Sequence, residues 1–220
     1  MHNSAYQYLG LNFVFIPLVV TDCKNAVAGI RALNFRGTAV SIPHKEEVMR
    51  YLNNIDTKAK SIGAVNTISN DNGILTGYNS DWIGAVEALK EVTVLENKKV
   101  ILIGAGGAAR AIAYGLSVSK ANVIIFNRSP EKAKKLAQTF KLEVGGNLNS
   151  VKNIKDYDIL INATSVGSAV GQLESMSSTH FFEQIFSILP KLNRCSFKFG
   201  MNPRVVVVMD SLGNNFNQFS

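Results

Sequence analysis

The feature that most constrains the fold is an uninterrupted apolar run that leads directly into a glycine-rich turn. Residues 98–104 read KKVILIG, and Gly104, Gly106 and Ala109 follow the pattern G-x-G-x-x-A before a helical stretch, Ala108 to Val118. A strand without polar alternation is typical of a parallel sheet that is buried on both faces. Further strand and helix patterns alternate after it. The sequence therefore predicts an α/β fold with a doubly wound parallel sheet in this part of the chain.

The other predicted elements divide the chain into two α/β domains, residues 1–95 and 96–220. The second domain is expected to continue with strands at 122–126, 157–164 and 204–210 and with a helix at 131–140. In the first domain we expect strands at 12–20 and 37–42, each followed by a helix, the first of these capped by Asp22. Asp71-Asn72-Gly73 predicts a hairpin, and Ser80 or Asp81 caps the helix after it. We expect the first domain to hold a mainly parallel sheet.

Composition and charge exclude several classes of protein. Hydrophobic residues make up 46% of the chain and charged residues 18%, as in globular proteins. No apolar run reaches the ~18–20 residues that span a bilayer, and the first residues lack the features of a signal peptide. The net charge of +7 comes from scattered lysines without interleaved aromatics, which argues against a nucleic-acid partner. The three histidines and two distant cysteines, Cys23 and Cys195, have no metal-ligand spacing, so we expect a cytoplasmic protein without a metal.

The glycine-rich turn predicts a dinucleotide site. Gly104 permits a tight turn, Gly106 lets the backbone approach a pyrophosphate, and Ala109 packs closely on the strand. The N-terminus of the helix that follows offers unpaired N–H groups to the anion. A tight turn with a purely structural role is the alternative, and the strand–turn–helix context favours the dinucleotide.

The end of the next strand indicates which dinucleotide binds. NAD enzymes usually place a carboxylate about 20 residues after the turn, where it accepts from the ribose 2′-OH. Here the chain offers Asn127, Arg128, Ser129 and Lys132, whose cations suit a 2′-phosphate. Taken alone, these residues fit a solvated turn with Ser129 as a helix cap equally well. With the glycine-rich turn upstream, they favour NADP.

Lys45 is a lysine at an unusual position. It follows Pro43 at the end of a predicted strand, where the dipole of the expected helix disfavours a cation. Taken alone, Lys45 fits a solvated side chain, Asp81 a helix cap, and Asn66 and Asn79 turn residues. In an α/β domain attached to a nucleotide fold, however, the carboxyl end of a strand is where substrates bind. Together these residues predict a catalytic site for a small molecule.

Several motifs in one order resemble the shikimate dehydrogenase family. They are SIPHKE, IGAVNT, GYNSDWIG, GAGGAAR, NRSPEK and NATSVG, and they cover about residues 1–167. The resemblance implies two α/β domains, an N-terminal substrate-binding domain and a Rossmann-type NADP-binding domain, with the substrate in the cleft between them. It implies NADP-dependent interconversion of 3-dehydroshikimate and shikimate, a step of aromatic amino-acid biosynthesis, by a monomer or homodimer.

The resemblance also implies roles for individual residues. Lys45 and Asp81 are the implied catalytic pair, and Ser41, Asn66 and Asp81 the implied contacts to substrate hydroxyls. The implied NADP-binding residues are Gly104, Ala105, Gly106, Gly107, Ala108, Asn127, Arg128, Ser129, Lys132 and Thr164. Hydride reduction of a ring ketone builds negative charge on its oxygen, which suits a proton-donating lysine.

The chain departs from the family pattern at both ends. The pair of serines that usually precedes His-Asn is absent, and the resemblance fades after Gly167, where Asp210 is retained but Gly213 replaces a tyrosine. We therefore expect NADP binding with poor turnover of shikimate. Two alternatives stay open. One is a quinate/shikimate dehydrogenase, whose typical NAD preference would want an acid near Asn127. The other is a truncated, weakly active or non-catalytic NADP-binding paralogue.

Overall fold

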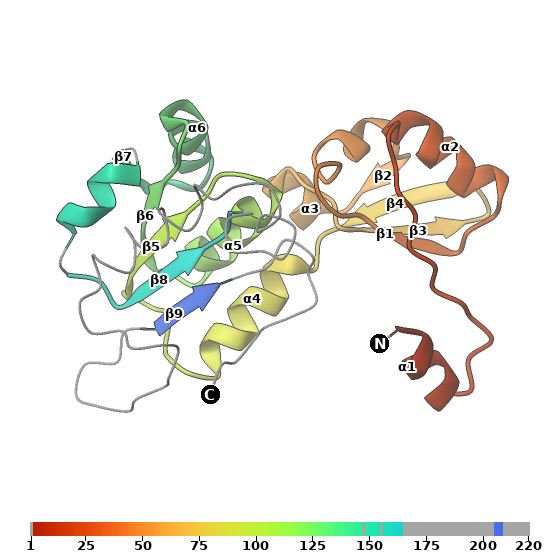
Figure 1. Ribbon diagram of the computed structural model, residues 1–220, viewed down its shortest axis with the longest axis horizontal. Helices are drawn as coiled ribbons and strands as arrows, with labels where there is room; N and C mark the ends of the chain where they lie inside the picture. Colours follow the sequence, from red (N-terminus) through yellow and green to blue (C-terminus); the bar gives the residue numbers. More distant parts are fainter. Residues whose placement is uncertain (1, 147, 155, 165–204, 209–220) are drawn as a thin grey trace, which may run out of the picture.

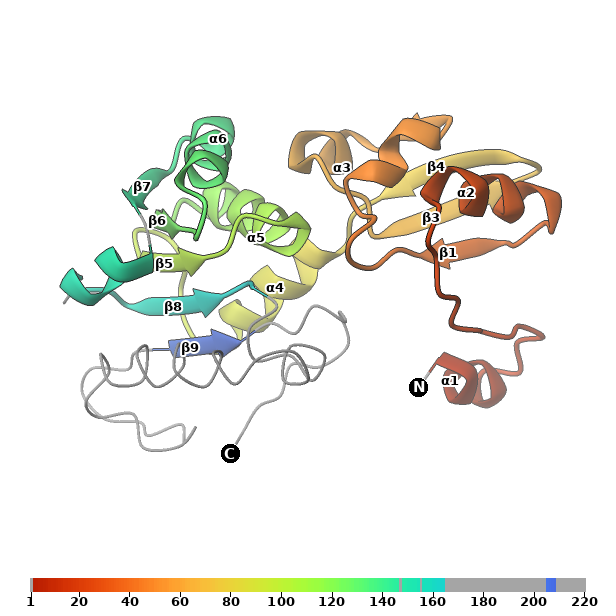
Figure 2. The same cartoon turned by 45° about the horizontal axis from the view of Figure 1, so that its top comes forward.

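The computed structural model describes residues 2–146, 148–154, 156–164 and 205–208, which form two α/β units side by side (Figures 1 and 2). The first unit contains α1 (His2–Tyr8), α2 (Cys23–Ala32), β1 (Gly37–Ala39), the 3-10 helix η1 (Glu47–Tyr51), β2 (Asn54–Ile55), α3 (Thr57–Ile62), β3 (Thr67–Asp71) and β4 (Ile74–Tyr78). Then follow α4 (Asp81–Lys90), β5 (Lys99–Ile103), α5 (Gly107–Val118), β6 (Asn122–Phe126), α6 (Pro130–Phe140), β7 (Glu143–Gly146), the 3-10 helix η2 (Leu148–Asn153), β8 (Ile159–Asn162) and β9 (Val205–Val208). The predicted α/β class with two domains is confirmed.

The first sheet has the strand order β1-β3-β4-β2. Its β1–β3 and β3–β4 pairs are antiparallel and its β2–β4 pair is parallel, so the sheet is mixed, not mainly parallel as predicted. The cause is the predicted hairpin, which is confirmed. Asn72 (φ 52°) and Gly73 (φ 86°) form a two-residue turn with positive φ at both positions, and such a turn joins neighbouring antiparallel strands.

Helix α2 covers this sheet and begins as the sequence predicts. The Asp22 carboxylate accepts a hydrogen bond from the Asn25 backbone N–H at 2.9 Å, which satisfies one of the free donors of the first turn. Val27 and Ile30 are buried and pack in a cluster with Leu75 and other apolar residues of the unit. Cys23, Val27 and Ile30 are therefore the packed face of α2.

Two predictions in the first unit are wrong. Residues 12–20 form no strand and expose several apolar side chains, among them Val14 (75%) and Val19 (99%). Strand propensity is realised only against a paired neighbour, and no described strand pairs with this stretch. The expected helix after Pro43 is only the short η1. In the turn before η1, the Lys45 carbonyl accepts a hydrogen bond from the Val65 N–H at 2.8 Å, so this carbonyl is bonded to the segment before β3 and not within a helix.

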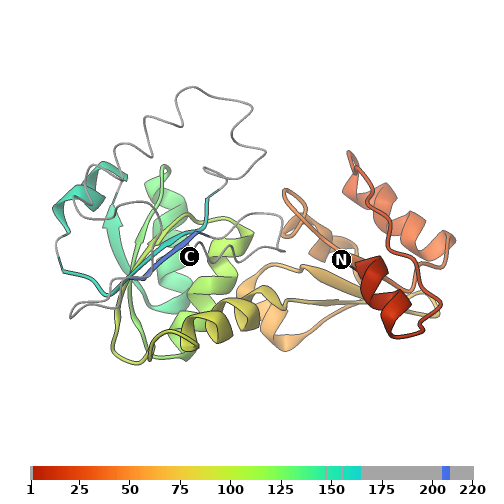
Figure 3. The ribbon, with the colours of Figure 1, turned by 60° about the horizontal axis from the view of Figure 1, so that its bottom comes forward.

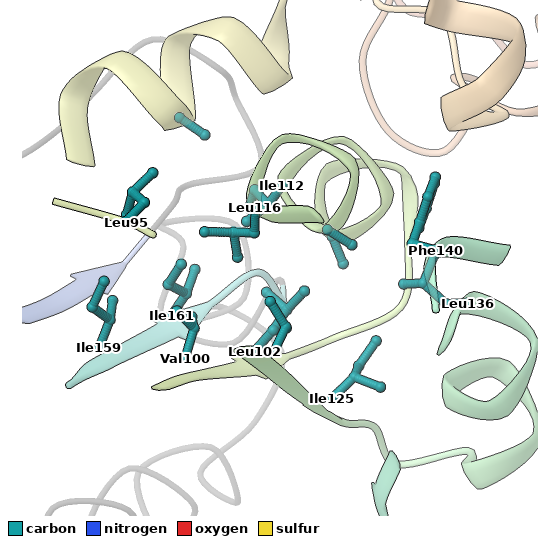
Figure 4. Packing of buried hydrophobic residues seen from close by; sticks show 14 of the residues in the cluster. Leu95, Val100, Leu102, Ile112, Leu116, Ile125, Leu136, Phe140, Ile159 and Ile161 are labelled. Carbon is teal, nitrogen blue, oxygen red and sulfur yellow. The ribbon is translucent and has the colours of Figure 1, made fainter. Parts of the chain in front are cut away.

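The second sheet has the order β7-β6-β5-β8-β9, and all of its pairs are parallel. Alternate residues of β5 are buried on opposite faces, as the uninterrupted apolar run predicts. Val100 and Leu102 pack with side chains of α4, α5 and α6 (Figure 4), whereas Ile101 and Ile103 pack on the other side with Phe126 and other residues. The strand order reverses between β5 and β8, which is the point where open α/β sheets bind ligands.

Helix α4 connects the two units. It begins after β4 of the first sheet, yet its buried residues Ala85, Val86 and Leu89 pack in the core of the second unit, alongside α5 (Figure 3). Helices α4 and α5 approach each other closely at Gly115 of α5, where a Cβ atom would lie 2.6 Å from Cγ2 of Val86. Helix α4 therefore packs as part of the second unit, although the predicted boundary at residue 95 assigns it to the first domain. None of the described helices is long and apolar enough to cross a bilayer.

Candidate active site

Lys45 and Asp81 form a shielded ion pair. Nζ of Lys45 lies 2.8 Å from Oδ2 of Asp81, and the two side chains are only 9% and 14% exposed. Lys45 lies in the turn that precedes η1, and Asp81 is the first residue of α4. The N-terminus of a helix stabilises a carboxylate, so the charge of Asp81 is stabilised both by the ammonium and by the start of α4. From the sequence we expect a helix dipole to disfavour the Lys45 ammonium. In the structure, the helix that begins at this site is α4, and its dipole favours the Asp81 carboxylate that pairs with Lys45.

Two asparagines orient Asp81. Nδ2 of Asn66 donates to Oδ1 of Asp81 at 2.6 Å, and the Ser80 N–H donates to Oδ1 of Asn66 at 3.0 Å. Asn79 is buried; its Oδ1 accepts from the Asp81 N–H at 3.0 Å and its Nδ2 donates to the Ala64 carbonyl at 2.9 Å. One carboxylate oxygen therefore faces Lys45 and the other faces Asn66. Ser80 is the N-cap of α4 but makes no side-chain capping bond.

Ser41 is exposed and lies in the same turn as Lys45. Its carbonyl accepts a hydrogen bond from the His44 N–H at 3.0 Å, which closes the turn. The structure therefore brings Lys45, Asp81 and Asn66 into direct contact, and places Ser41 in the loop that carries Lys45.

The glycine-rich turn lies next to this group. Gly104 has φ 118°, and a Cβ atom there would lie 2.9 Å from the carbonyl oxygen of Ala163, so the turn after β5 fits closely against the residues that follow β8. Gly106 is the N-cap of α5, and a Cβ atom there would meet nothing within 4 Å. On Gly107, a Cβ atom would lie 3.3 Å from Cβ of Lys45. The turn thus has one open face and lies beside the stem of Lys45.

Thr164 is held beside the same turn. Oδ1 of buried Asn162 accepts from the Thr164 N–H at 3.1 Å and from its hydroxyl at 2.7 Å. A Cβ atom on Gly104 would lie 3.3 Å from the methyl carbon of Thr164. The ends of β5 and β8 therefore meet at the point where the strand order reverses, and Thr164 borders it.

The segment after β6 carries exposed cations. Asn127 donates from Nδ2 to the Ser129 carbonyl at 3.0 Å, and Ser129 is the N-cap of α6 without a side-chain capping bond. Arg128 and Lys132 are exposed and have no ion-pair partner within the part of the chain that the structure describes. Their charges are therefore available to an anion at this edge of the sheet. Asp210 and Gly213 lie outside the described residues.

Arg110 is the last residue of the GAGGAAR motif, but the sequence patterns assigned no role to it. Its Nε donates to the Ile62 carbonyl at 2.9 Å, so α5 of the second unit is bonded to the end of α3 in the first. Ile62, Ala64 and Ala111 form a small buried cluster at the same contact. The available signal was a charged residue in an otherwise apolar helical stretch, directly after the glycine-rich turn.

Comparison with known proteins gives matches over both units. The model of the shikimate dehydrogenase substrate binding domain matches residues 1–68, and that of shikimate / quinate 5-dehydrogenase matches residues 86–185. The NADP(+) shikimate dehydrogenase of Methanothermobacter thermautotrophicus is 44% identical over 176 residues, which cover 76% of this chain and 62% of that protein.

Solved structures agree with these matches. The shikimate dehydrogenase of Aquifex aeolicus is 40% identical with a TM-score of 0.70, over 76% of this chain and 63% of that one. The shikimate 5-dehydrogenase of Thermus thermophilus, solved with NADP(H) and shikimate, is 33% identical with a TM-score of 0.63, over 74% and 61% of the two chains. The chain spans about three fifths of the length of these relatives. With two family models matching most of its residues, the chain belongs to the shikimate dehydrogenase family.

Proposed function

We propose that this chain catalyses the reversible, NADP-dependent reduction of 3-dehydroshikimate to shikimate. The observation that carries the proposal is the shielded Lys45–Asp81 pair beside the open glycine-rich turn. An ammonium that is held by a carboxylate, at the edge of a dinucleotide-type turn, is suited to a reaction that creates and removes charge on an oxygen atom. The activities named for the relatives support the substrate and the cofactor.

The chemistry follows from the geometry of the pair. Reduction of a ring ketone builds negative charge on the ketone oxygen, and Lys45 can stabilise this charge and donate a proton to it. Asp81 holds Nζ in place through the 2.8 Å contact. In the direction of alcohol oxidation, the same pair receives the proton. NADP, when bound, supplies or accepts the hydride.

The residues around the turn fit NADP. The absence of a side chain at Gly106 leaves its face open, and the N-terminus of α5 presents free N–H groups to an anion. Exposed Arg128 and Lys132 suit a 2′-phosphate, and Asn127 stands at the strand end where NAD enzymes usually carry a carboxylate. Glu131, between the two cations, pairs with Lys134 at 3.1 Å. The residues that we assign to the cofactor are Gly104, Ala105, Gly106, Gly107, Ala108, Asn127, Arg128, Ser129, Lys132 and Thr164.

We assign the substrate hydroxyls to Ser41, Asn66 and Asp81. Asn66 and Asp81 are in contact with each other and adjoin Lys45, so they form one polar surface that can hydrogen-bond a polyol. Residues 1–95 then constitute the substrate-binding and catalytic domain and residues 96–220 the NADP-binding domain. Helix α4 lies within residues 1–95 and connects the domains, because its buried face packs on the NADP-binding domain.

The test is the formation of NADPH from NADP with shikimate, followed by absorbance. Quinate replaces shikimate and NAD replaces NADP in parallel reactions. We expect the NADP–shikimate pair to give the highest kcat/KM. A higher value for NAD with quinate would contradict the assignment in favour of a quinate/shikimate dehydrogenase. Saturable NADPH binding without any NADPH formation would contradict it in favour of a non-catalytic protein.

A further inference from the structure

A group of side chains outside the proposed active site has the chemistry of a metal site. Sγ of Cys23, a ring nitrogen of His44 and a carboxylate oxygen of Glu47 all lie within 4.8 Å of one another. Cys23 begins α2, His44 lies in the turn that carries Lys45, and Glu47 begins η1. The spacing of these residues along the chain showed no such pattern, because the fold alone brings α2 and this turn together.

The hydrogen bonding of His44 points to a ligand at Nδ1. Nε2 lies 3.0 Å from the Val20 carbonyl oxygen, which can only accept, so Nε2 carries a proton; in the neutral ring the lone pair is then on Nδ1. Nδ1 is buried and has no hydrogen-bond partner among the described residues. Glu47 Oε2 lies 3.8 Å away, beyond hydrogen-bond range. A backbone carbonyl on the far nitrogen is the arrangement that orients histidine ligands of metals.

The surroundings of Cys23 and the exposure of Glu47 are compatible with cation binding. Cys23 is buried, and burial together with the carboxylates of Glu47 and Asp22 raises the pKa of its thiol. The nearby carboxylates favour a cation at the sulfur, and a cation that binds there has to displace the thiol proton. The Glu47 side chain is 46% exposed, so it can rotate toward the other two ligands without disturbing a packed core.

We propose that Cys23, His44 and Glu47 form a binding site for a soft divalent cation of the zinc class. Thiolate, imidazole and carboxylate are zinc ligands, whereas Mg²⁺ and Ca²⁺ prefer oxygen alone. Bonds of about 2.0–2.3 Å in a tetrahedral arrangement place ligand atoms roughly 3.5 Å apart, so the group has to contract by about 1 Å. Three protein ligands leave a fourth position for water. His44 precedes Lys45 directly, so a bound cation would fix the turn that carries the lysine.

The test uses the untagged chain and cobalt(II), a spectroscopic substitute for zinc. We expect one cobalt per chain, with a thiolate-to-cobalt charge-transfer absorption that added zinc removes. Cys23→Ser should abolish this absorption, and zinc should bind at least about tenfold more weakly. Cys195→Ser is the matched control and should leave both unchanged. An absorption that survives in Cys23→Ser, or that is lost in Cys195→Ser, would overturn the site, as would the absence of any cobalt binding by the wild-type chain.

His44→Gln tests the same site without altering the buried thiol. The glutamine amide can still donate to the Val20 carbonyl, but it offers no nitrogen lone pair. We expect weaker zinc binding by at least about tenfold, with thermal unfolding close to that of the wild type. Zinc should also protect Cys23 from alkylation in the wild type and much less in His44→Gln. Equal zinc affinity and equal protection in both chains would exclude His44 as a ligand and overturn the proposal, even if Cys23→Ser failed to fold.

Discussion

Replacing Arg110 with leucine removes a hydrogen bond that joins the two units of the chain. Nε of Arg110 donates to the carbonyl of Ile62, the last residue of α3, at 2.9 Å. Final carbonyls of a helix lack a partner within the helix, and a cation near them also compensates the helix dipole. The guanidinium further packs on the C-cap: a Cβ atom on Gly63 would lie 2.7 Å from Nη2 of Arg110.

The expected magnitude follows from these contacts. A hydrogen bond from a charged donor contributes about 1.5–3 kcal/mol, and leucine keeps the packing of the aliphatic stem. We therefore expect Arg110→Leu to lower the free energy of unfolding by about 1.5–3 kcal/mol and the Tm by about 3–12 °C. Because the bond crosses between the units, kcat should fall by up to about 10²-fold while the Kd for NADPH stays the same.

The control is Lys60→Leu, which removes a positive charge from the last turn of α3, the helix whose end Arg110 of α5 contacts. Lys60 is exposed and makes no ion pair with the described residues. The Tm of each variant is measured by circular dichroism and its kcat by steady-state kinetics. Equal melting temperatures and equal kcat in Arg110→Leu and Lys60→Leu would refute the role of Arg110 in holding the units together.

Lys45→Met and Asp81→Asn should each lower kcat by about 10²–10⁴-fold. The double variant should be no slower than the slower single variant, because the two groups act as a unit. Losses in kcat that multiply in the double variant would show that the two groups act separately. Arg128→Gln should weaken NADP binding about ten- to a hundredfold and leave NAD binding unchanged in fluorescence titrations, whereas equal losses would make Arg128 structural. The Lys99 N–H and the Lys98 ammonium lower the pKa of Asp158. Its contribution to stability is therefore complete above the unfolded value of about 4 and lost as the pH falls through the lower folded value. Asp158→Asn should cost about 1 kcal/mol at neutral pH, allowing for partial exposure, and urea unfolding should show this difference vanish in acid; a difference that persists at low pH would contradict the assignment.

Elements that depend on local signals could be predicted from the sequence. The apolar run of β5 fixes its burial on both faces, the Asn72-Gly73 turn specifies its hairpin, and Asp22 specifies the start of α2. In each case the residues that determine the element lie within it or next to it. The glycine-rich turn was predictable for the same reason, since Gly104 needs its positive φ to make the turn.

Features that depend on distant neighbours could not be predicted. Residues 12–20 have the composition of a strand, but no described strand pairs with them, and α3, β2 and β7 are too short or too polar to give a periodic signal. The pairing of Lys45 with Asp81 was implied by the family resemblance, but local signals alone could not predict it, because the contact depends on the path of the whole first unit. The bond from Arg110 to Ile62 likewise joins segments far apart in the chain, so only the fold shows it.

Proton transfer by the amine of Lys45 can be tested with single-turnover kinetics. The chain is saturated with NADPH and mixed with 3-dehydroshikimate, and the loss of NADPH fluorescence is followed in the wild type and in Lys45→Ala. We expect the same Kd for NADPH in both proteins and a rate lower by about 10²–10⁴-fold in the variant. An equal single-turnover rate in the two proteins, with equal NADPH affinity, would contradict it.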